Sequence, residues 1–181
     1  MNKTFKRILC VVLAVAITAV GIPFAALAST PDTVNFGILS DIHIFDETAM
    51  GTTLENQKEA NEILKMNNSS SGLTTALTET AMRNLTKKAL DGEIDFLLIP
   101  GDLTKNGEKE SHKSFIRELN KLKESGKKIY LITAGHDYNE VSYGYKGTER
   151  VDVEGTSFDE LFDFYHSFGY DQALAFDKRT H

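Results

Sequence analysis

The sequence is short of cysteine and of positive charge, and it contains no internal repeat. Its one cysteine, Cys10, lies in an N-terminal segment that we expect to be removed, so the mature protein would have no disulfide bond. Removing residues 1–28 would also remove three of the 20 Lys and Arg residues, which leaves 17 against 26 Asp and Glu and a net charge of −9. This acidic balance argues against nucleic acid or an anionic membrane as the main partner, because both require a cationic surface.

The first 28 residues have the layout of a secretory signal peptide. MNKTFKR is basic, residues 8–28 carry no charge, and the apolar run ends in Ala-Leu-Ala, which is typical of a cleavage site. An uncleaved membrane anchor is the alternative, since the run nearly reaches spanning length. Gly21, Pro23 and the Ala-Leu-Ala ending favour cleavage. We therefore expect a protein of the cell envelope or the medium, with no integral membrane span once the signal is removed.

The rest of the chain, residues 29–181, alternates strand-like and helical patterns. Short segments rich in β-branched or aromatic residues predict strands at 34–39, 94–99 and 128–133. Helical periodicity fills the gaps between them and follows the last one. The residues that carry it are Leu73, Leu77, Ala81, Leu85 and Ala89 in the first stripe, Phe115, Leu119 and Leu122 in the second, and Phe158, Leu161, Phe162 and Tyr165 after a capping box of Ser157 and Glu160 in the third. Strands that alternate with helices predict an α/β fold of parallel βαβαβ units.

Two regions fit this pattern less well. Residues 46–72 predict an insertion after the first strand, with a helix-like stretch, LENQKEANEILKM, followed by a flexible break, NNSSSG. The segment from Tyr138 to Gly155, rich in tyrosine and glycine, is expected to be a mobile surface loop, with the wall of a substrate pocket as the alternative.

Polar residues follow each predicted strand at once. Asp41 and His43 follow the first, Asp102 comes after Pro100-Gly101 at the end of the second, and His136 with Asp137 follows the third. In an open parallel sheet the carboxyl ends of the strands share one edge, where ligands bind, so these side chains are expected to converge. Carboxylates and imidazoles together suit Mn²⁺, Fe or Zn²⁺. Each short motif is weak by itself, but their order is specific.

In these residues the sequence resembles the calcineurin-like metallophosphoesterase family. The family pattern runs D-x-H, G-D-x-x-x-x-G, G-N-H-[DE], and two later histidine motifs. Asp41-x-His43 matches the first motif and Gly101-Asp102-x-x-x-x-Gly107 matches the second. The resemblance extends from about Val34 to Asp137 and more loosely to the end of the chain. It implies a layered sandwich, of which this chain would hold the N-terminal βαβαβ half of a longer or truncated protein. Such a half would leave one apolar face of its sheet exposed.

The resemblance also implies the chemistry. Asp41 and His43 would bind one of two divalent metal ions, Asp102 would bridge both, and a hydroxide between them would attack phosphorus. His136 would stabilise or protonate the leaving group. The substrate would be a small phosphoester rather than a phosphoprotein, because Lys105 and Asn106 replace the aspartate and arginine of the protein-phosphatase branch.

The third motif departs from the family. Gly135 stands where the family has an asparagine whose side-chain oxygen binds the second metal, so that metal lacks a ligand unless water or Asn139 replaces it. Of the other histidines, His112 is expected to be solvated or to cap a helix, and His166 to pack or hydrogen-bond rather than bind metal. Asp137 has three open roles: to orient His136, to coordinate through water, or to cap a turn.

Three functional hypotheses follow. The first is an exported, metal-dependent hydrolase of phosphoester bonds, which makes the chain an enzyme. The alternative is a degenerate or truncated envelope protein that binds without turnover, which Gly135 and the lack of the two later histidine motifs would explain. A metal-free structural domain is the third, but it does not explain the order in which acids and imidazoles follow the strands.

Overall fold

The computed structural model describes residues 33–51, 53–66 and 71–174. The expected signal peptide, residues 1–28, lies outside these ranges, as do Cys10 and His181, so the signal stays a prediction. The chain divides after Val34, and the residues from Asn35 onwards form one compact unit. No helix within the described ranges is both long enough and apolar enough to cross a membrane.

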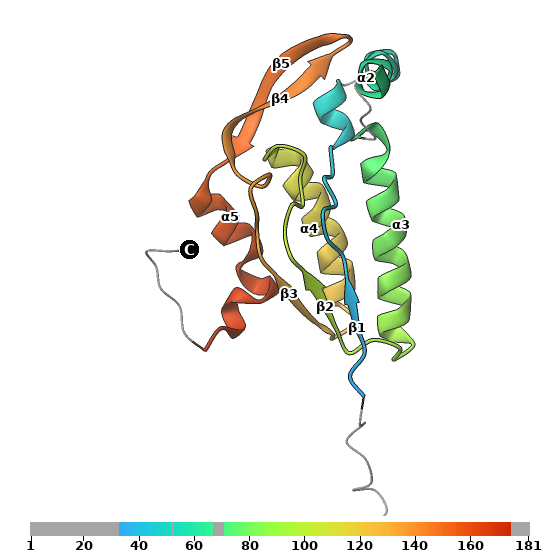
Figure 1. Ribbon diagram of the computed structural model, residues 1–181, viewed down its shortest axis with the longest axis vertical. Coiled ribbons are helices and arrows are strands. Elements are labelled where there is room, and N and C mark those ends of the chain that lie inside the picture. Colours follow the sequence, from blue (N-terminus) through green and yellow to red (C-terminus); the bar gives the residue numbers. More distant parts are fainter. Residues whose placement is uncertain (1–32, 52, 67–70, 175–181) are drawn as a thin grey trace, which may run out of the picture. The chain divides into compact units, whose positions relative to one another are not determined.

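A three-stranded parallel sheet forms the centre of this unit. Its strands are β1 (Phe36–Ile38), β2 (Phe96–Ile99) and β3 (Lys128–Leu131), which lie side by side in that order (Figure 1). A connection that contains at least one helix joins each strand to the next, so the predicted parallel βαβαβ arrangement is confirmed. Each strand lies inside its predicted segment but is shorter.

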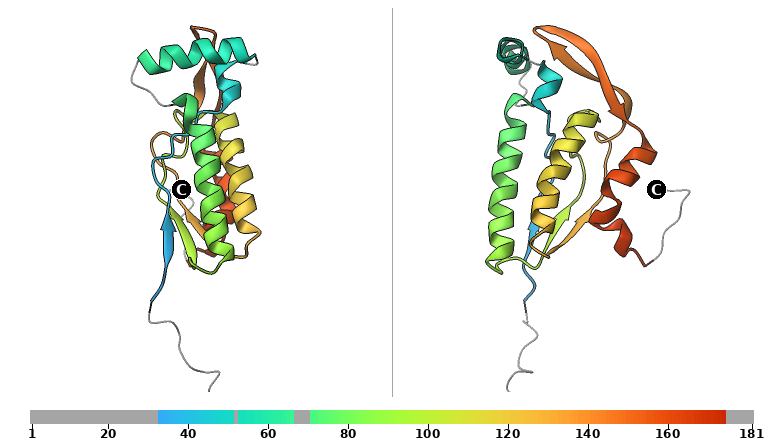
Figure 2. Two further views of the ribbon diagram at one scale, coloured as in Figure 1. Left: turned by 90° about the vertical axis from the view of Figure 1, so that its right-hand side faces the viewer. Right: turned by 180° about the vertical axis from the view of Figure 1, so that it is seen from behind.

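Two long helices, α3 (Ser71–Leu90) and α4 (Lys109–Lys123), cover the same face of the sheet (Figures 1 and 2). The alternate strand residues that face them, such as Leu97 and Ile129, are buried in one core with the predicted α4 stripe. Gly37 of β1 lies close to two leucine side chains, because a Cβ there would lie 2.9 Å from Leu97 Cδ1 and 3.0 Å from Leu85 Cδ2, so both would have to shift. Glycine at this position therefore allows α3 to approach the sheet closely.

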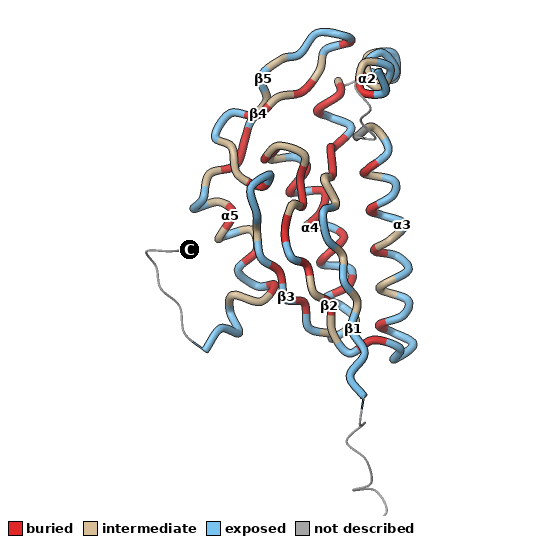
Figure 3. The backbone as a smooth tube through the Cα atoms, in the orientation of Figure 1, coloured by how far each residue is buried: buried red, intermediate tan, exposed pale blue. Residues whose placement is uncertain are grey.

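The first half of α3 buries a different face from the one that the leucine pattern predicted, whereas in its second half Ala89 is buried and Leu85 packs against the core, as predicted. Leu73 and Leu77 are 63% and 60% exposed, whereas Thr74, Thr78 and Met82 are buried. Figure 3 shows buried and exposed positions alternating along α3. The reason is local: the Thr74 hydroxyl accepts a hydrogen bond from the backbone N–H of Phe45, at 2.8 Å. The helix turns a polar row towards the chain segment that follows β1, because that segment needs partners for its backbone.

The opposite face of the sheet is apolar and largely uncovered. A row of rings crosses it: the Phe36 and Phe96 centroids lie 5.3 Å apart, and those of Phe96 and Tyr130 lie 5.7 Å apart. Phe36 is 48% exposed and Ile38 is 61% exposed. The expectation of an exposed apolar sheet face is confirmed for these residues.

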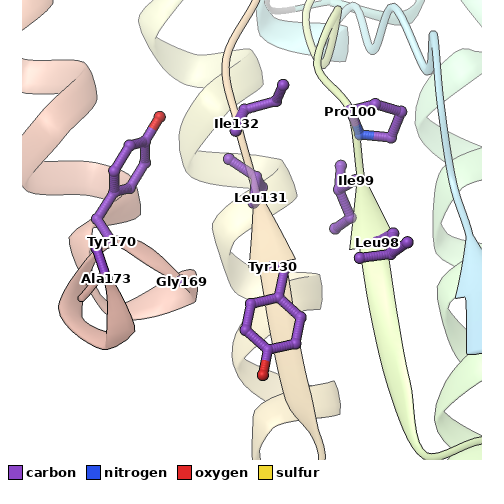
Figure 4. A pocket seen from close by; sticks show the side chains of 9 residues that line it. All are labelled: Leu98, Ile99, Pro100, Tyr130, Leu131, Ile132, Gly169, Tyr170 and Ala173. Carbon is purple, nitrogen blue, oxygen red and sulfur yellow. The ribbon is translucent and has the colours of Figure 1, made fainter. Parts of the chain in front are cut away.

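The last described elements lie along the β3 edge. Helix α5 (Phe158–Tyr165) begins at the predicted Ser157–Glu160 capping box, which is present, and packs against α4. The short turns η3 (His166–Phe168) and η4 (Tyr170–Gln172) follow. Between them and β3 lies an apolar pocket of about 370 Å³ (Figure 4). Its lining residues are Leu98, Ile99, Pro100, Tyr130, Leu131, Ile132, Gly169, Tyr170 and Ala173.

The two irregular regions of the sequence fold together. The predicted insertion forms η2 (Glu47–Met50) and α2 (Leu54–Met66). The segment expected to be a mobile loop is instead an antiparallel hairpin, β4 (Asn139–Lys146) and β5 (Glu149–Thr156). Both contribute to a second small core, which consists of Phe45, Ala49, Met50, Ala60 and Leu64 with Tyr145 packed against it. The loop prediction was wrong: the two strands pair antiparallel, and Tyr145 of β4 packs against the core of the insertion. Ser71 and Gly72, expected in a flexible break, begin α3.

Candidate metal centre

The first two strands continue side by side beyond their formal ends. The backbone N–H of His43 donates to the Asp102 carbonyl at 3.0 Å, and that of Ile44 donates to the Leu103 carbonyl at 2.8 Å. Parallel pairing therefore carries the first and second motifs to the same level at the carboxyl edge of the sheet. The expected convergence of these motifs is confirmed.

The backbone at this edge is strained at three positions. Asp41, His43 and Asp102 have positive φ angles of 52°, 45° and 52°, and they are the only residues other than glycine with this conformation in the described part of the chain. Such conformations cost on the order of 1–3 kcal/mol each and cluster at functional sites. The strain falls on the three residues that the sequence predicted as metal ligands.

Gly101 allows the second and third strand ends to meet. Its φ is 98°, and a Cβ there would lie 2.6 Å from the Cβ of Ala134. A larger residue would push the third motif away from the second. The glycine before Asp102 is thus required both by the turn and by the close approach.

Three of the predicted site residues form one group. The ligand atoms of His43, Asp102 and His136 all lie within 4.8 Å of one another. The two imidazole rings meet edge to face, with centroids 4.6 Å apart. Each residue comes from a different strand end, so only the folded sheet brings them together.

The direction of the His136 ring is fixed by its backbone and by its neighbour Lys105. The His136 backbone N–H donates to Asp102 Oδ1 at 3.1 Å. Nδ1 of the ring lies 2.7 Å from the Lys105 carbonyl oxygen, which can only accept, so Nδ1 carries the proton. Nε2 of the neutral ring then has a lone pair for a ligand. Burial lowers the pKa of the Lys105 ammonium, although the Glu108 carboxylate opposes this.

The Asp137 side chain joins the second and third motifs through hydrogen bonds to the backbone of both. Its carboxylate is fully buried and accepts backbone hydrogen bonds from Leu103 at 2.7 Å, Thr104 at 2.9 Å and Ala134 at 2.9 Å. Burial raises the pKa of this carboxyl, and the three N–H donors oppose the shift. Of the open roles for Asp137, the structure favours the structural one, in which the side chain closes a turn and joins two loops.

Two predicted features of the metal site lie outside this group. Asp41 is exposed, and its carboxylate accepts a hydrogen bond from the neighbouring Ser40 hydroxyl. Its part as a ligand stays a prediction. Gly135 has open space around it, because a Cβ there would meet no atom within 4 Å, and its φ is not in the left-handed region. The position could therefore accept a side chain.

His112, which was expected to be solvated or to cap a helix, lies behind this group. It is fully buried, with Nε2 2.9 Å from the Asp137 carbonyl oxygen and Nδ1 2.7 Å from the Tyr165 hydroxyl. The surface expectation was wrong, because α4 turns this residue towards the third motif. The sequence did contain a signal for this burial: His112 lies three residues before Phe115, which places both on the same face of the helix. His166 is exposed and packs its ring on Phe162, with centroids 5.1 Å apart, so it lies outside the group.

The fold and this group of side chains define an α/β protein with a candidate metal centre at the carboxyl edge of its sheet. The model of the calcineurin-like phosphoesterase family matches residues 34–178, and the chain belongs to this family. A comparison with curated proteins gives no match. Membership indicates metal-dependent hydrolysis of phosphoesters as the class of activity, with a small phosphoester as the substrate class.

The residues present fit a divalent metal. Two imidazoles and a carboxylate form a borderline ligand set that suits Zn²⁺, Fe or Mn²⁺. Metal–ligand bonds of about 2.0–2.2 Å allow ligand atoms on one ion to lie as far apart as about 4 Å, close to the spacing of this group. His43 and Asp102 are the predicted ligands in this group, and the His136 ring lies beside them.

Proposed function

We propose that this chain is an exported hydrolase that cleaves small phosphoesters at a dinuclear centre of divalent metal ions. The observation that carries the proposal is the convergence of His43, Asp102 and His136 from three strand ends. Family membership supports the reaction class. The signal-like first 28 residues support export.

Each residue has a distinct part in this proposal. His43 and Asp102, with Asp41, would hold the metal, and Asp102 would lie between the two ions. When bound, the ions would supply Lewis-acid stabilisation of the phosphoryl oxygens and a more acidic water. His136, aimed by the Lys105 carbonyl, would stabilise the leaving group, and in its doubly protonated form it would donate the Nε2 proton to the leaving oxygen.

The reaction is tested by hydrolysis of p-nitrophenyl phosphate and bis-p-nitrophenyl phosphate in Mn²⁺, Zn²⁺ or Fe²⁺. Activity should vanish with a chelator and return with metal. Asp102→Asn should abolish turnover, since it removes the bridging charge, while Asp95→Asn is the matched control. Asp95 lies before β2, away from the carboxyl ends of the strands, and within the described residues its carboxylate accepts a hydrogen bond from the Asn35 backbone N–H. If Asp102→Asn is as active as the original chain, the proposed hydrolysis at this metal centre is wrong.

The second ion is tested at Gly135, which has space for a side chain. Gly135→Asn would provide an amide oxygen where the family has one, and should tighten the weaker of two ions by roughly tenfold. Gly135→Ala is the control, because it adds a Cβ without a ligand atom. Titration calorimetry of both variants measures the change. Unchanged affinity and rate in Gly135→Asn would show that the site is organised differently.

Binding without turnover is the second candidate, and Gly135 is the observation that favours it. A chain that binds metal and phosphate but hydrolyses neither ester would establish this candidate in place of the enzyme. Export is measured separately, from the N-terminal sequence of the protein recovered from the envelope or the medium. Cleavage as proposed gives a chain that begins at Ser29.

A further inference from the structure

A pair of buried polar side chains lies behind the third motif. His112 comes from α4 and Tyr165 from the end of α5, and both have no exposed surface. The two helices pack against each other at the edge of the sheet (Figure 1). The ring centroids of His112 and Tyr165 lie 5.6 Å apart, and the Tyr165 hydroxyl lies 2.7 Å from His112 Nδ1.

The hydrogen-bond directions in this pair follow from chemistry. Nε2 of His112 faces the Asp137 carbonyl oxygen at 2.9 Å, and a carbonyl only accepts, so Nε2 carries the proton. In the neutral ring Nδ1 then accepts, and Tyr165 donates its hydroxyl proton. Burial lowers the pKa of His112 to about 4, in agreement with a neutral ring. The chain of donors thus runs one way, from Tyr165 through His112 to the Asp137 backbone.

Asp137 connects this pair to the candidate metal centre. Its side chain binds the N–H groups of Leu103 and Thr104, which directly follow Asp102, and that of Ala134. Its backbone directly follows His136. Asp137 therefore joins the loop that carries Asp102 to the loop that carries His136. Its backbone carbonyl accepts a hydrogen bond from His112, which lies outside the site.

We propose that His112, supported by Tyr165, is a positioning residue for the metal centre: it holds the Asp137 carbonyl and so fixes the loop that aims His136. This inference rests on the proposed function for its catalytic consequence. Its structural part stands on the buried contacts alone. Both residues are buried behind the third motif, and neither belongs to a motif from which the family resemblance was read.

The experiment compares two substitutions at His112. His112→Phe keeps the ring and much of its volume but leaves the Asp137 carbonyl without a donor. His112→Gln can place an amide N–H near the Nε2 position and keep that bond. Leu122→Ala is the control, because it weakens the same helix at a buried residue in its last turn, away from the motif. Tyr165→Phe is a second, milder variant in case His112→Phe does not fold.

Three readouts are taken: amide hydrogen exchange at Leu103, Thr104 and Ala134 without metal, metal affinity, and the steady-state constants for an aryl phosphate. His112→Phe should speed exchange at these amides at least tenfold, weaken metal binding about tenfold, and lower kcat at least tenfold with KM within twofold. His112→Gln should restore most of each. Tyr165→Phe should change all three in the same direction by a smaller factor.

Two results would overturn the inference. One is unchanged exchange and metal affinity in both His112→Phe and Tyr165→Phe. The other is an equal effect of His112→Phe, His112→Gln and Leu122→Ala on all readouts, which would reduce His112 to general core packing. If the original chain hydrolyses no ester, the proposed function fails, while the exchange and metal affinities still decide the positioning role.

Discussion

Helices α3 and α4 cover the same face of the sheet, yet only α4 buries the whole of the apolar stripe that its sequence predicts. Helix α4 buries the apolar stripe that its sequence shows, including Phe115, Leu119 and Leu122. Helix α3 buries Thr74 and Thr78 and leaves two leucines exposed. Both helices also supply hydroxyl groups to the chain segment after β1, from Thr74 on α3 and from Ser111 on α4. On α4 the hydroxyl contact and the apolar stripe lie on the same buried side, whereas on α3 the Thr74 contact turns the first part of the helix away from its leucines.

The largest difference in the free energy of unfolding is expected when one side chain in each helix is truncated to alanine. Phe115→Ala should lower the free energy of unfolding by about 3–5 kcal/mol, because its ring is fully buried in the main core. Leu73→Ala on α3 should change it by no more than about 0.5 kcal/mol, since the side chain is mostly exposed. Urea denaturation measures both. Similar losses from the two substitutions would contradict the burial assigned to α3.

A pH dependence specific to α4 comes next. Burial lowers the pKa of His112 to about 4 from 6.5, so the unfolded chain binds a proton that the folded chain does not between these values. The stabilising contribution is complete above about pH 6.5 and is lost as the pH falls towards 4, and it amounts to roughly 3 kcal/mol at most.

The measurement is the free energy of unfolding from pH 7 to pH 4 in the original chain and in His112→Gln. The variant should lose this part of the slope, although the raised pKa of Asp137 acts in the opposite direction in both proteins. Identical slopes in the two proteins would mean that His112 is not held neutral in the folded state.

A smaller effect tests the polar face of α3. Thr74→Val keeps the shape of the side chain but leaves the Phe45 N–H without its partner, which should cost about 1–3 kcal/mol. Thr80→Val is the matched control, because Thr80 is exposed and its hydroxyl donates only to the Ala76 carbonyl of its own helix among the contacts of the described residues. Thermal unfolding compares the two. If both cost the same, the Thr74 contact does not orient α3.

The smallest change in the free energy of unfolding is expected when a charge is placed on the exposed side of α3. Leu77→Lys should change the free energy of unfolding by no more than about 0.5 kcal/mol, because the side chain is 60% exposed. Met82→Lys on the buried side should unfold the protein or cost several kcal/mol. Circular dichroism at increasing urea concentrations distinguishes these outcomes. If Met82→Lys is tolerated, Met82 does not lie on the face of α3 that packs against the sheet.

Much of the candidate site could be predicted from sequence because each motif is local. A strand followed by Asp41 and His43, or by Gly101 and Asp102, places polar groups at the carboxyl edge of a parallel sheet whatever the later packing. The capping box of α5 is local in the same way, since Ser157 and Glu160 satisfy each other's backbone. These predictions needed only the strand order and the turn chemistry.

The sequence by itself determined the parallel sheet, the order of its helices and the residues at the strand ends, because these follow from periodicity and from turns of a few residues. Only the tertiary structure decided that His43, Asp102 and His136 form one group while the Asp41 carboxylate binds Ser40. It also decided that His112 is buried behind Asp137 and that residues 139–156 pair as a hairpin over the insertion. These outcomes depend on contacts between segments far apart in the chain, which local patterns do not encode.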